Sequence, residues 1–204
     1  SVSRAAIVKK ILVALAVIHH VRLKDFGWPV FDGEFLRGRY KTWRDFLAVE
    51  SSNWIRVVLE TDQKLKLLPI ENLETFIMRT LDRADYSGPS VLVHGDAINP
   101  SNILLNKDQE VTLLDWEWSI AGDLAWEFCD LGWWPLLNES SMADYFKATN
   151  IDSKKETENF LKRVRLYIPL WLLWGAHMHA NDATPDVYLA LRKLLIANLS
   201  PRLH

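Results

Sequence analysis

Residues 91–130 restrict the possible fold more strongly than any other stretch, because two short apolar runs there lead into acidic residues. Residues 91–93 precede His-Gly-Asp, which ends at Asp96, and residues 111–114 lead directly into Asp115. Each run has the length and composition of a short buried strand. Two such strands, each with a carboxylate at its end, would form the floor of an active site.

A hairpin is predicted between these two runs. Residues 100–102 form a Pro-Ser-Asn corner, and residues 103–105 are a third apolar run. The next residues, 106–109, have the composition of a turn, so the third run is expected to pair with residues 111–114.

This hairpin brings three oxygen-bearing side chains, Asp96, Asn102 and Asp115, toward one place. Carboxylate and amide oxygens suit a hard cation such as Mg2+, which keeps some of its water and binds substrate phosphates. Phosphoryl transfer needs metal ions that neutralise phosphate charge and a carboxylate that orients the attacking hydroxyl. The arrangement therefore suggests phosphoryl transfer.

The motifs resemble those of the aminoglycoside phosphotransferase and choline kinase superfamily. His-Gly-Asp at residues 94–96 is followed by Asn102, then by Asp-Trp-Glu at residues 115–117 and Gly-Asp at residues 122–123. The resemblance implies an α+β, mainly α, fold: the helical C-terminal lobe of a protein-kinase-like fold, with a small β-hairpin carrying the catalytic loop. It also implies Mg2+ and ATP or GTP as cofactors.

One residue departs from the family's spacing. The family's Asn usually stands five residues after the Asp of His-Gly-Asp, where this chain has Ser101, and Asn102 is sixth. The extra residue is expected to form a bulge, because Asn99-Pro100 favours a turn.

The resemblance also implies a role for each motif residue. Asp96 orients the substrate hydroxyl or accepts its proton, and Asn102 and Asp115 bind Mg2+. His94 belongs to the catalytic loop, with its imidazole bonded to the backbone around Asp115. Glu117 contacts a second metal ion or a water on one; the alternative is a solvated carboxylate at a strand end.

Gly122 and Asp123 are expected to brace the site, with Asp123 also capping a helix that begins at Leu124. Only residues 116–122 separate Asp115 from Asp123. Protein kinases, by resemblance, need a long activation segment here to hold a peptide, so its absence favours a small-molecule acceptor.

Acidic and aromatic residues are concentrated between residues 117 and 152, where Lys147 is the one basic residue. Such a stretch suits a cationic amine, and Glu127 and Trp118 are the predicted acceptor contacts within it. The alternative is that its tryptophans are core and its carboxylates are solvated. Asp182 is a further acceptor candidate, since the family's acceptor pockets use C-terminal helices.

Composition sets wider limits. A chain of 204 residues with 49% hydrophobic residues can form a single domain, residues 1–204. Its net charge of -2 is no reason to expect a nucleic-acid partner. The single cysteine, Cys129, fits a reducing compartment, so a cytoplasmic location is expected. The most apolar windows, residues 11–18 and 168–176, are too short to span a membrane.

Helical periodicity accounts for most of the remaining chain. The expected helices are residues 3–21 with Ser3 as N-cap, 42–61, 69–83, 124–137, 141–148, 154–181 and a last one from Thr184 or Pro185. Pro169 should kink the longest of these, because proline removes a backbone donor. Residues 26–33 are expected to form an irregular connection.

The chain contains no glycine-rich phosphate loop. In the family an N-terminal lobe before the first helix supplies that loop and reads the nucleotide base, so the chain is expected to be a C-terminal lobe alone. It would then be a fragment, a truncated product or a natural half, with little or no kinase activity by itself. The missing lobe would be supplied in cis or by another chain.

The acceptor stays open among aminoglycosides, choline-like alcohols, methylthioribose, homoserine and other sugars, as does ATP against GTP. A second hypothesis is a non-catalytic module that binds a ligand or partner in the acidic and aromatic cleft. A third is a lobe that pairs with another chain, which predicts exposed apolar residues near the first helix and around the hairpin.

Overall fold

The computed structural model describes residues 3–108, 110–135, 137 and 139–199. The helices are α1 (Arg4–Ile18), α2 (Trp43–Lys64), α3 (Leu73–Arg83), α4 (Glu139–Ala148), α5 (Lys154–Met178) and α6 (Asp186–Leu199), with 3-10 turns η1 (Pro100–Asn102) and η2 (Leu124–Phe128). The strands are β1 (Val30–Phe31), β2 (Leu36–Arg37), β3 (Val91–Val93), β4 (Ile103–Leu105), β5 (Val111–Leu113) and β6 (Ile120–Gly122). The fold is α+β and mainly α, as predicted.

Residue contacts divide the chain into two compact units. Unit 1 holds the residues up to Trp43 together with Tyr86–Val164, and unit 2 holds Arg44–Asp85 together with the residues from Arg165 onward. All strands and the His-Gly-Asp motif belong to unit 1.

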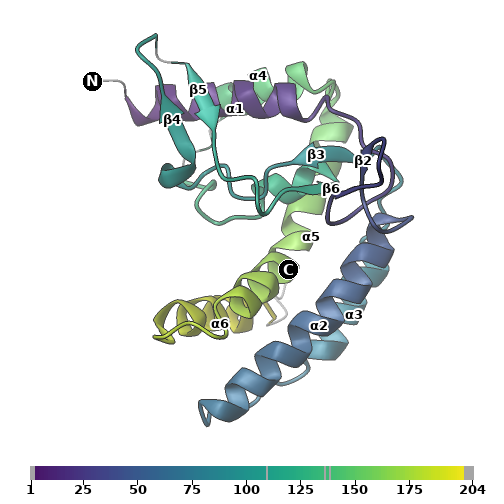
Figure 1. Cartoon of the computed structure of the whole chain (residues 1–204), viewed down its shortest axis with the longest axis vertical. Helices are drawn as coiled ribbons and strands as arrows, with labels where there is room; N and C mark the ends of the chain where they lie inside the picture. Colours follow the sequence, from purple (N-terminus) through teal and green to yellow (C-terminus); the bar gives the residue numbers. More distant parts are fainter. Residues whose placement is uncertain (1–2, 109, 136, 138, 200–204) are drawn as a thin grey trace. The chain divides into compact units, whose positions relative to one another are not determined.

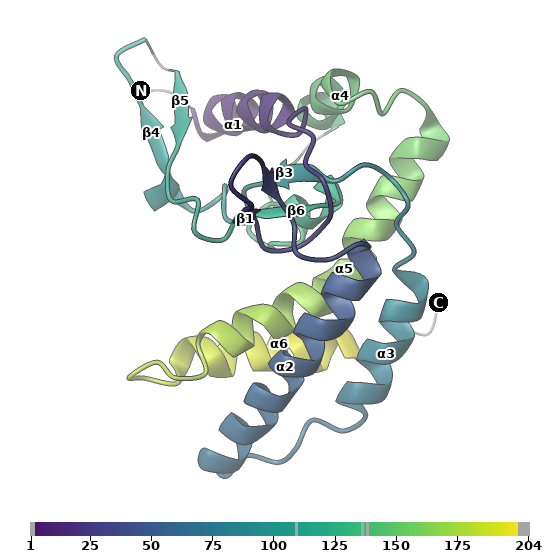
Figure 2. The same cartoon turned by 45° about the vertical axis from the view of Figure 1, so that its right-hand side comes forward.

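Helix α1 begins where the sequence predicts. The Ser3 hydroxyl oxygen accepts a hydrogen bond of 3.3 Å from the Ala6 amide, which satisfies one of the free donors of the first turn. Its buried residues are Val8, Ile11, Leu12, Leu15 and Ala16. This face packs beside α4 in unit 1 (Figures 1 and 2).

The connection after α1 is more regular than predicted. Strands β1 and β2 pair antiparallel, with Val30 opposite Arg37, and Gly27 exchanges two backbone hydrogen bonds with Ala121 of β6. This pairing was not expected because the two strands have only two residues each. The connection thus lies beside strand β6.

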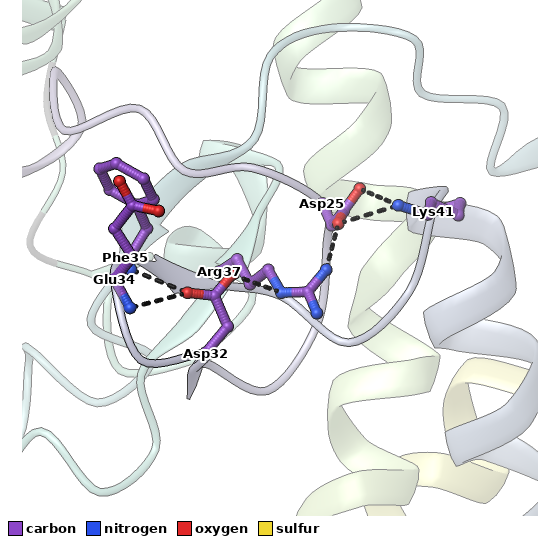
Figure 3. Close-up of polar contacts among 6 residues, drawn as sticks. All are labelled: Asp25, Asp32, Glu34, Phe35, Arg37 and Lys41. Carbon is purple, nitrogen blue, oxygen red and sulfur yellow. Dashed lines mark hydrogen bonds and ion pairs between the residues drawn. The ribbon is translucent and has the colours of Figure 1, made fainter.

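Figure 3 shows the ion pairs that hold this connection. The Asp25 carboxylate lies 3.2 Å from the Lys41 ammonium and 3.5 Å from the Arg37 guanidinium, whose Nε lies 3.2 Å from Asp32. Asp32 also accepts from the backbone amides of Phe35 and Glu34, which lower the pKa of its carboxyl. These ion pairs therefore stabilise a segment whose strands β1 and β2 form few backbone hydrogen bonds.

Two further strand pairs carry the predicted motifs. Strand β3 pairs antiparallel with β6, and β4 pairs antiparallel with β5 as the predicted hairpin. Strand β6 was not predicted, because it is short and ends in glycine. That glycine, Gly122, is required by packing: a Cβ there would lie 2.6 Å from a ring carbon of Trp43.

The predicted helix over residues 124–137 is wrong. Among the described residues of this stretch, the one helical segment is the short 3-10 turn η2, in which the Cys129 amide donates to the carbonyl of Trp126. The Asp130 carboxylate then accepts from the Gly132 amide at 2.7 Å, so a side chain takes the place of the next helical bond. An aromatic cluster follows, in which the ring centroid of Phe128 lies 5.1–5.5 Å from those of Trp133, Tyr145 and Phe160.

Unit 2 is helical. Helix α2 runs beside α3, and α6 beside the end of α5 (Figures 1 and 2). Asp62 joins α2 to α6: its carboxylate accepts from the Tyr188 hydroxyl at 2.5 Å and pairs with the Arg192 guanidinium at 2.7 and 2.9 Å. Helix α5 continues through Pro169 and ends at Met178, three residues before the predicted end.

In the part of the chain that the structure describes, no helix is both long and apolar enough to cross a membrane.

Candidate functional site

The His-Gly-Asp motif lies directly after β3, in a backbone turn that requires glycine. Gly95 has a φ of 86°, and a Cβ there would lie 2.6 Å from the carbonyl oxygen of Trp118. The turn leaves Asp96 half-buried, two residues after the buried His94. Because β3 ends in this tight turn, the Asp96 carboxylate lies at the end of the strand.

The His94 imidazole is bonded to the backbone beside Asp115, as predicted. Its Nε2 lies 2.9 Å from the carbonyl oxygen of Leu114, and its Nδ1 accepts from the Asp96 amide at 3.3 Å. One donor and one acceptor correspond to the neutral imidazole with the proton on Nε2. The ring packs against Trp116 with centroids 4.6 Å apart, so His94 ties the loop to the hairpin.

Asn102 faces Asp96 despite the shifted spacing. Its amide nitrogen donates to the Asp96 backbone carbonyl at 3.0 Å and to the carboxylate oxygen Oδ2 at 2.9 Å. The extra residue lies in η1, whose first turn Asn99 caps by accepting from the Ser101 amide. The expected bulge is therefore a 3-10 turn.

Asp115 follows β5 in a left-handed conformation, with a φ of 59°. The residue before it, Leu114, donates its amide to the Asn102 carbonyl at 2.8 Å, so hairpin pairing places both metal candidates at the same end of the hairpin. The Asp115 side chain is exposed, and no described residue forms a hydrogen bond or ion pair with it. Glu117, two residues on, is also exposed.

The side-chain oxygens at this end of the hairpin suit a hard cation as ligands. Among the described residues, the amide oxygen of Asn102 accepts only from the Ser101 hydroxyl, at a long 3.3 Å, and the Asp115 carboxylate has no partner. Among the described residues no three His, Cys, Asp or Glu side chains group closely enough to hold a metal ion by themselves. A metal ion here would therefore depend on the Asn102 oxygen and on water or phosphate, as Mg2+ sites often do.

Asp123 caps η2, as predicted, by accepting from the Ala125 amide at 3.0 Å. Its other oxygen lies 2.6 Å from Nε of Arg163 on α5, and the Asp123 side chain is fully buried. This carboxylate joins the end of β6 to α5.

The three predicted acceptor residues lie in different surroundings. The Glu127 side chain is fully buried and accepts from the backbone amides of His94 and Gly95. Trp118 is half-buried, with its carbonyl against Gly95. Asp182 belongs to unit 2, where its carboxylate lies 2.6 Å from Nδ1 of His179. Their roles toward an acceptor stay predictions.

Asp130 was not singled out as a site residue from the sequence. Burial raises the pKa of its carboxyl, the Gly132 amide opposes this, and the negative charges of Asp96 and Glu127 raise it further. The carboxyl group of Asp130 therefore interacts electrostatically with the Asp96 and Glu127 carboxylates. Its place in an acidic stretch was the available signal.

Exposed apolar residues lie on α1 and around the hairpin, and whether they form a patch for a partner chain stays a prediction. They are Val13, Val17, Leu104, Leu114 and Trp116, with exposed fractions from 37% to 68%.

The pattern of the phosphotransferase enzyme family matches residues 2–158. Comparison with curated protein sequences finds no match.

Solved structures share the fold. Aminoglycoside phosphotransferase APH(4)-Ia is 19% identical with a TM-score of 0.60, over 97% of this chain and 64% of its own. A protein from Haemophilus somnus 129PT assigned as a fructosamine-3-kinase is 16% identical with a TM-score of 0.63, over 100% of this chain and 65% of its own. A thermostable mutant of the first enzyme, in ternary complex with AMP-PNP and hygromycin B, is 19% identical with a TM-score of 0.60, over 96% and 64%.

These likenesses confirm the predicted kinase-like fold. The chain spans about two thirds of the length of each of these proteins.

Proposed function

This chain belongs to the phosphotransferase enzyme family, and we propose that its site transfers the terminal phosphate of a nucleoside triphosphate to a hydroxyl of a small, amine-bearing molecule. The nucleotide is ATP or GTP. The ternary complex of the related enzyme, which holds AMP-PNP and hygromycin B, supports a nucleotide and a small molecule as substrates.

The contact between Asn102 and Asp96 carries this proposal. Two amide nitrogens, from Asn99 at 3.1 Å and Asn102 at 2.9 Å, donate to Oδ2 of Asp96. No described residue donates to Oδ1. Oδ1 is therefore available to accept the proton of an acceptor hydroxyl, and the carboxylate is held in one orientation for it.

The two amide donors also decide how Asp96 acts. The two hydrogen bonds to one oxygen fix the orientation of the Asp96 carboxylate. Asp96 therefore contributes mainly by orienting the hydroxyl toward the phosphorus, which is the part a carboxylate plays in phosphoryl transfer.

Asn102 and Asp115 would hold Mg2+ through their side-chain oxygens, and Glu117 would contact a water of a second ion. When bound, Mg2+ neutralises charge on the transferred phosphate. The exposed, unpaired Asp115 carboxylate supports this assignment, because no protein cation competes for it among the described residues.

Asp130 supports an amine on the acceptor. Its carboxyl is partly buried and has Asp96 and Glu127 as charged neighbours. A cationic group bound between Asp96 and Asp130 would offset this accumulation of negative charge. Aminoglycosides, choline-like alcohols and amino sugars share that chemistry.

The test is a transfer assay with Mg2+, labelled ATP or GTP, and a panel of amine-bearing alcohols that includes hygromycin B. We expect Asp96→Asn to lower kcat by at least about a hundredfold, since a neutral amide replaces the carboxylate that orients the hydroxyl and can take its proton. Asp108→Asn is the matched control, because Asp108 lies exposed in the turn of the same hairpin and away from the loop. Equal activity of the two variants would contradict the role of Asp96.

Metal binding is measured separately with Mn2+ as a paramagnetic probe. Asn102→Ala and Asp115→Asn should each weaken Mn2+ binding by about tenfold or more, while Asp108→Asn should not. Mn2+ and nucleotide binding without transfer to any acceptor would favour the non-catalytic binding module.

A further inference from the structure

Helix α6 buries one face against the rest of unit 2. Tyr188 and Leu195 are buried on this face, and the Tyr188 hydroxyl donates to the Asp62 carboxylate of α2 at 2.5 Å. Leu191 packs on Gly175 of α5, where an added Cβ would lie 3.3 Å from a methyl carbon of the leucine. These contacts determine which side of α6 faces solvent.

The opposite face of α6 is exposed although it is apolar. Its large apolar side chains, each 38% to 45% exposed, are Val187, Leu189, Leu194 and Ile196. Two small residues on the same side, Ala190 and Ala197, are also exposed. A helix that is apolar nearly all round is typical of a buried helix, because burial removes its apolar surface from water. Helix α6 therefore has the composition of a helix that a second surface covers.

Two charges of opposite sign, Asp186 and Lys193, lie on this exposed face. They are seven residues apart, which is about two helical turns, so they project from the same side of α6. No described residue forms a hydrogen bond or ion pair with either side chain. The remaining charged residue of α6, Arg192, points inward to Asp62. The exposed face thus has a negative group near its start and a positive group two turns later.

Such a face is complementary to itself. When two copies of α6 lie antiparallel about a two-fold axis beside Ala190, Asp186 of each copy comes opposite Lys193 of the other, and both pairs form together. The small side chain of Ala190 lets the two backbones approach, with Val187 and Leu194 packing on either side. An axis closer to Lys193 would bring two lysines together, so charge favours the register centred on Ala190. A partner surface of a single sign of charge would match only one of the two groups.

We propose that the exposed face of α6 docks a second copy of this chain, in an antiparallel contact centred on Ala190. A contact confined to one helix face is smaller than the interfaces of stable complexes, so the dimer is weak and reversible. The inference uses no residue of the proposed phosphate site and is independent of the proposed function.

The test is sedimentation equilibrium of the whole chain at concentrations from about 1 µM to about 500 µM. The average mass should rise with concentration toward that of a dimer. Ala190→Glu should stay monomeric over the whole range, because two carboxylates would face each other across the axis. Glutamate is a good helix former, so the circular dichroism and melting temperature should equal those of the wild type. Thr75→Glu, at an exposed position of α3, is the matched control and should dimerise like the wild type.

Charge reversal tests the orientation of the two helices. Asp186→Lys and Lys193→Asp should each raise the dissociation constant about tenfold, because each replaces two attractive pairs with two repulsive ones. The double variant, which exchanges the two charges, should bring the constant back to within about threefold of the wild type. Arg79→Asp, at an exposed position of α3, changes the net charge as Lys193→Asp does and should leave the dissociation constant unchanged.

Three results would overturn this inference. A chain that is monomeric at every concentration would mean that another segment or a different partner covers α6. A dimer that persists in Ala190→Glu would use another face of the molecule. A double charge variant that dimerises no better than the single variants would contradict the antiparallel register.

Discussion

Gly95 shows how one residue determines the geometry of the site. Its left-handed backbone lets the chain turn within two residues of β3, and its missing side chain makes room for the Trp118 carbonyl. Any other residue would strain the backbone and collide with that carbonyl. The position of Asp96 therefore depends on a neighbour that has no functional group.

A left-handed alanine costs about 1–2 kcal/mol by itself. The change Gly95→Ala should reduce the free energy of unfolding by more than about 2 kcal/mol, because the clash with the Trp118 carbonyl adds to that strain. Gly33→Ala is the control. Gly33 has a φ of 99° but nothing within 4 Å of an added Cβ, so it should show the strain alone, about 1–2 kcal/mol. Chemical denaturation measures both, and an equal loss in the two variants would contradict the clash.

At the scale of elements, buried side chains replace missing backbone regularity. Turn η2 is too short to be held by its own hydrogen bonds, so Asp123 caps its start and pairs with Arg163 of α5. The Arg163 guanidinium also lies 5.2 Å from the ring centroid of Tyr86, a cation–π distance. One carboxylate thus connects β6, η2 and α5.

The change Asp123→Asn keeps an oxygen for the cap but leaves Arg163 without its ion pair. We expect it to lower the free energy of unfolding by about 3 kcal/mol, since removing one partner of a buried pair leaves the other uncompensated. Asp144→Asn, which breaks the exposed pair with Lys9, should cause no measurable change. Comparable losses in the two variants would show that burial of the Asp123 pair is energetically unimportant.

At the scale of the whole molecule, Glu127 and Asp130 contribute to the pH dependence of stability. Burial works to raise the pKa of Glu127, but its contact with His19 lowers it below the ordinary value of 4.5. The unfolded chain therefore binds more protons there in acid. Stability contributed by Glu127 is present above about pH 4.5 and is lost as the pH falls toward the folded-state pKa. Asp130 acts in the opposite sense, because its pKa is raised.

We expect the free energy of unfolding to fall as the pH drops below about 4.5, and to fall less steeply in Glu127→Gln, which lacks that titrating group. Glu158→Gln, an exposed carboxylate on α5, should keep the wild-type slope. Denaturation series across this pH range measure the slopes, and identical slopes for the three proteins would show that Glu127 does not carry the dependence.

The sequence by itself was sufficient for features carried by neighbouring residues. The hairpin of β4 and β5, the Ser3 cap of α1 and the Asp123 cap of η2 all depend on a few consecutive residues. The kinase-like fold followed from motifs within residues 94–123. The wrong helix over residues 124–137 arose because apolar periodicity is the same for a helix and for a buried irregular segment.

Only the tertiary structure decided the contacts between residues far apart in the chain. His19 and Tyr145 are 126 residues apart, and His19 reaches Glu127 from the end of another helix. No local pattern specifies such a pair, because burial and charge compensation depend on which elements pack together. The sequence determined which residues form the proposed site, and the packing of α1, α4 and η2 determined which side chains lie behind the loop that carries them.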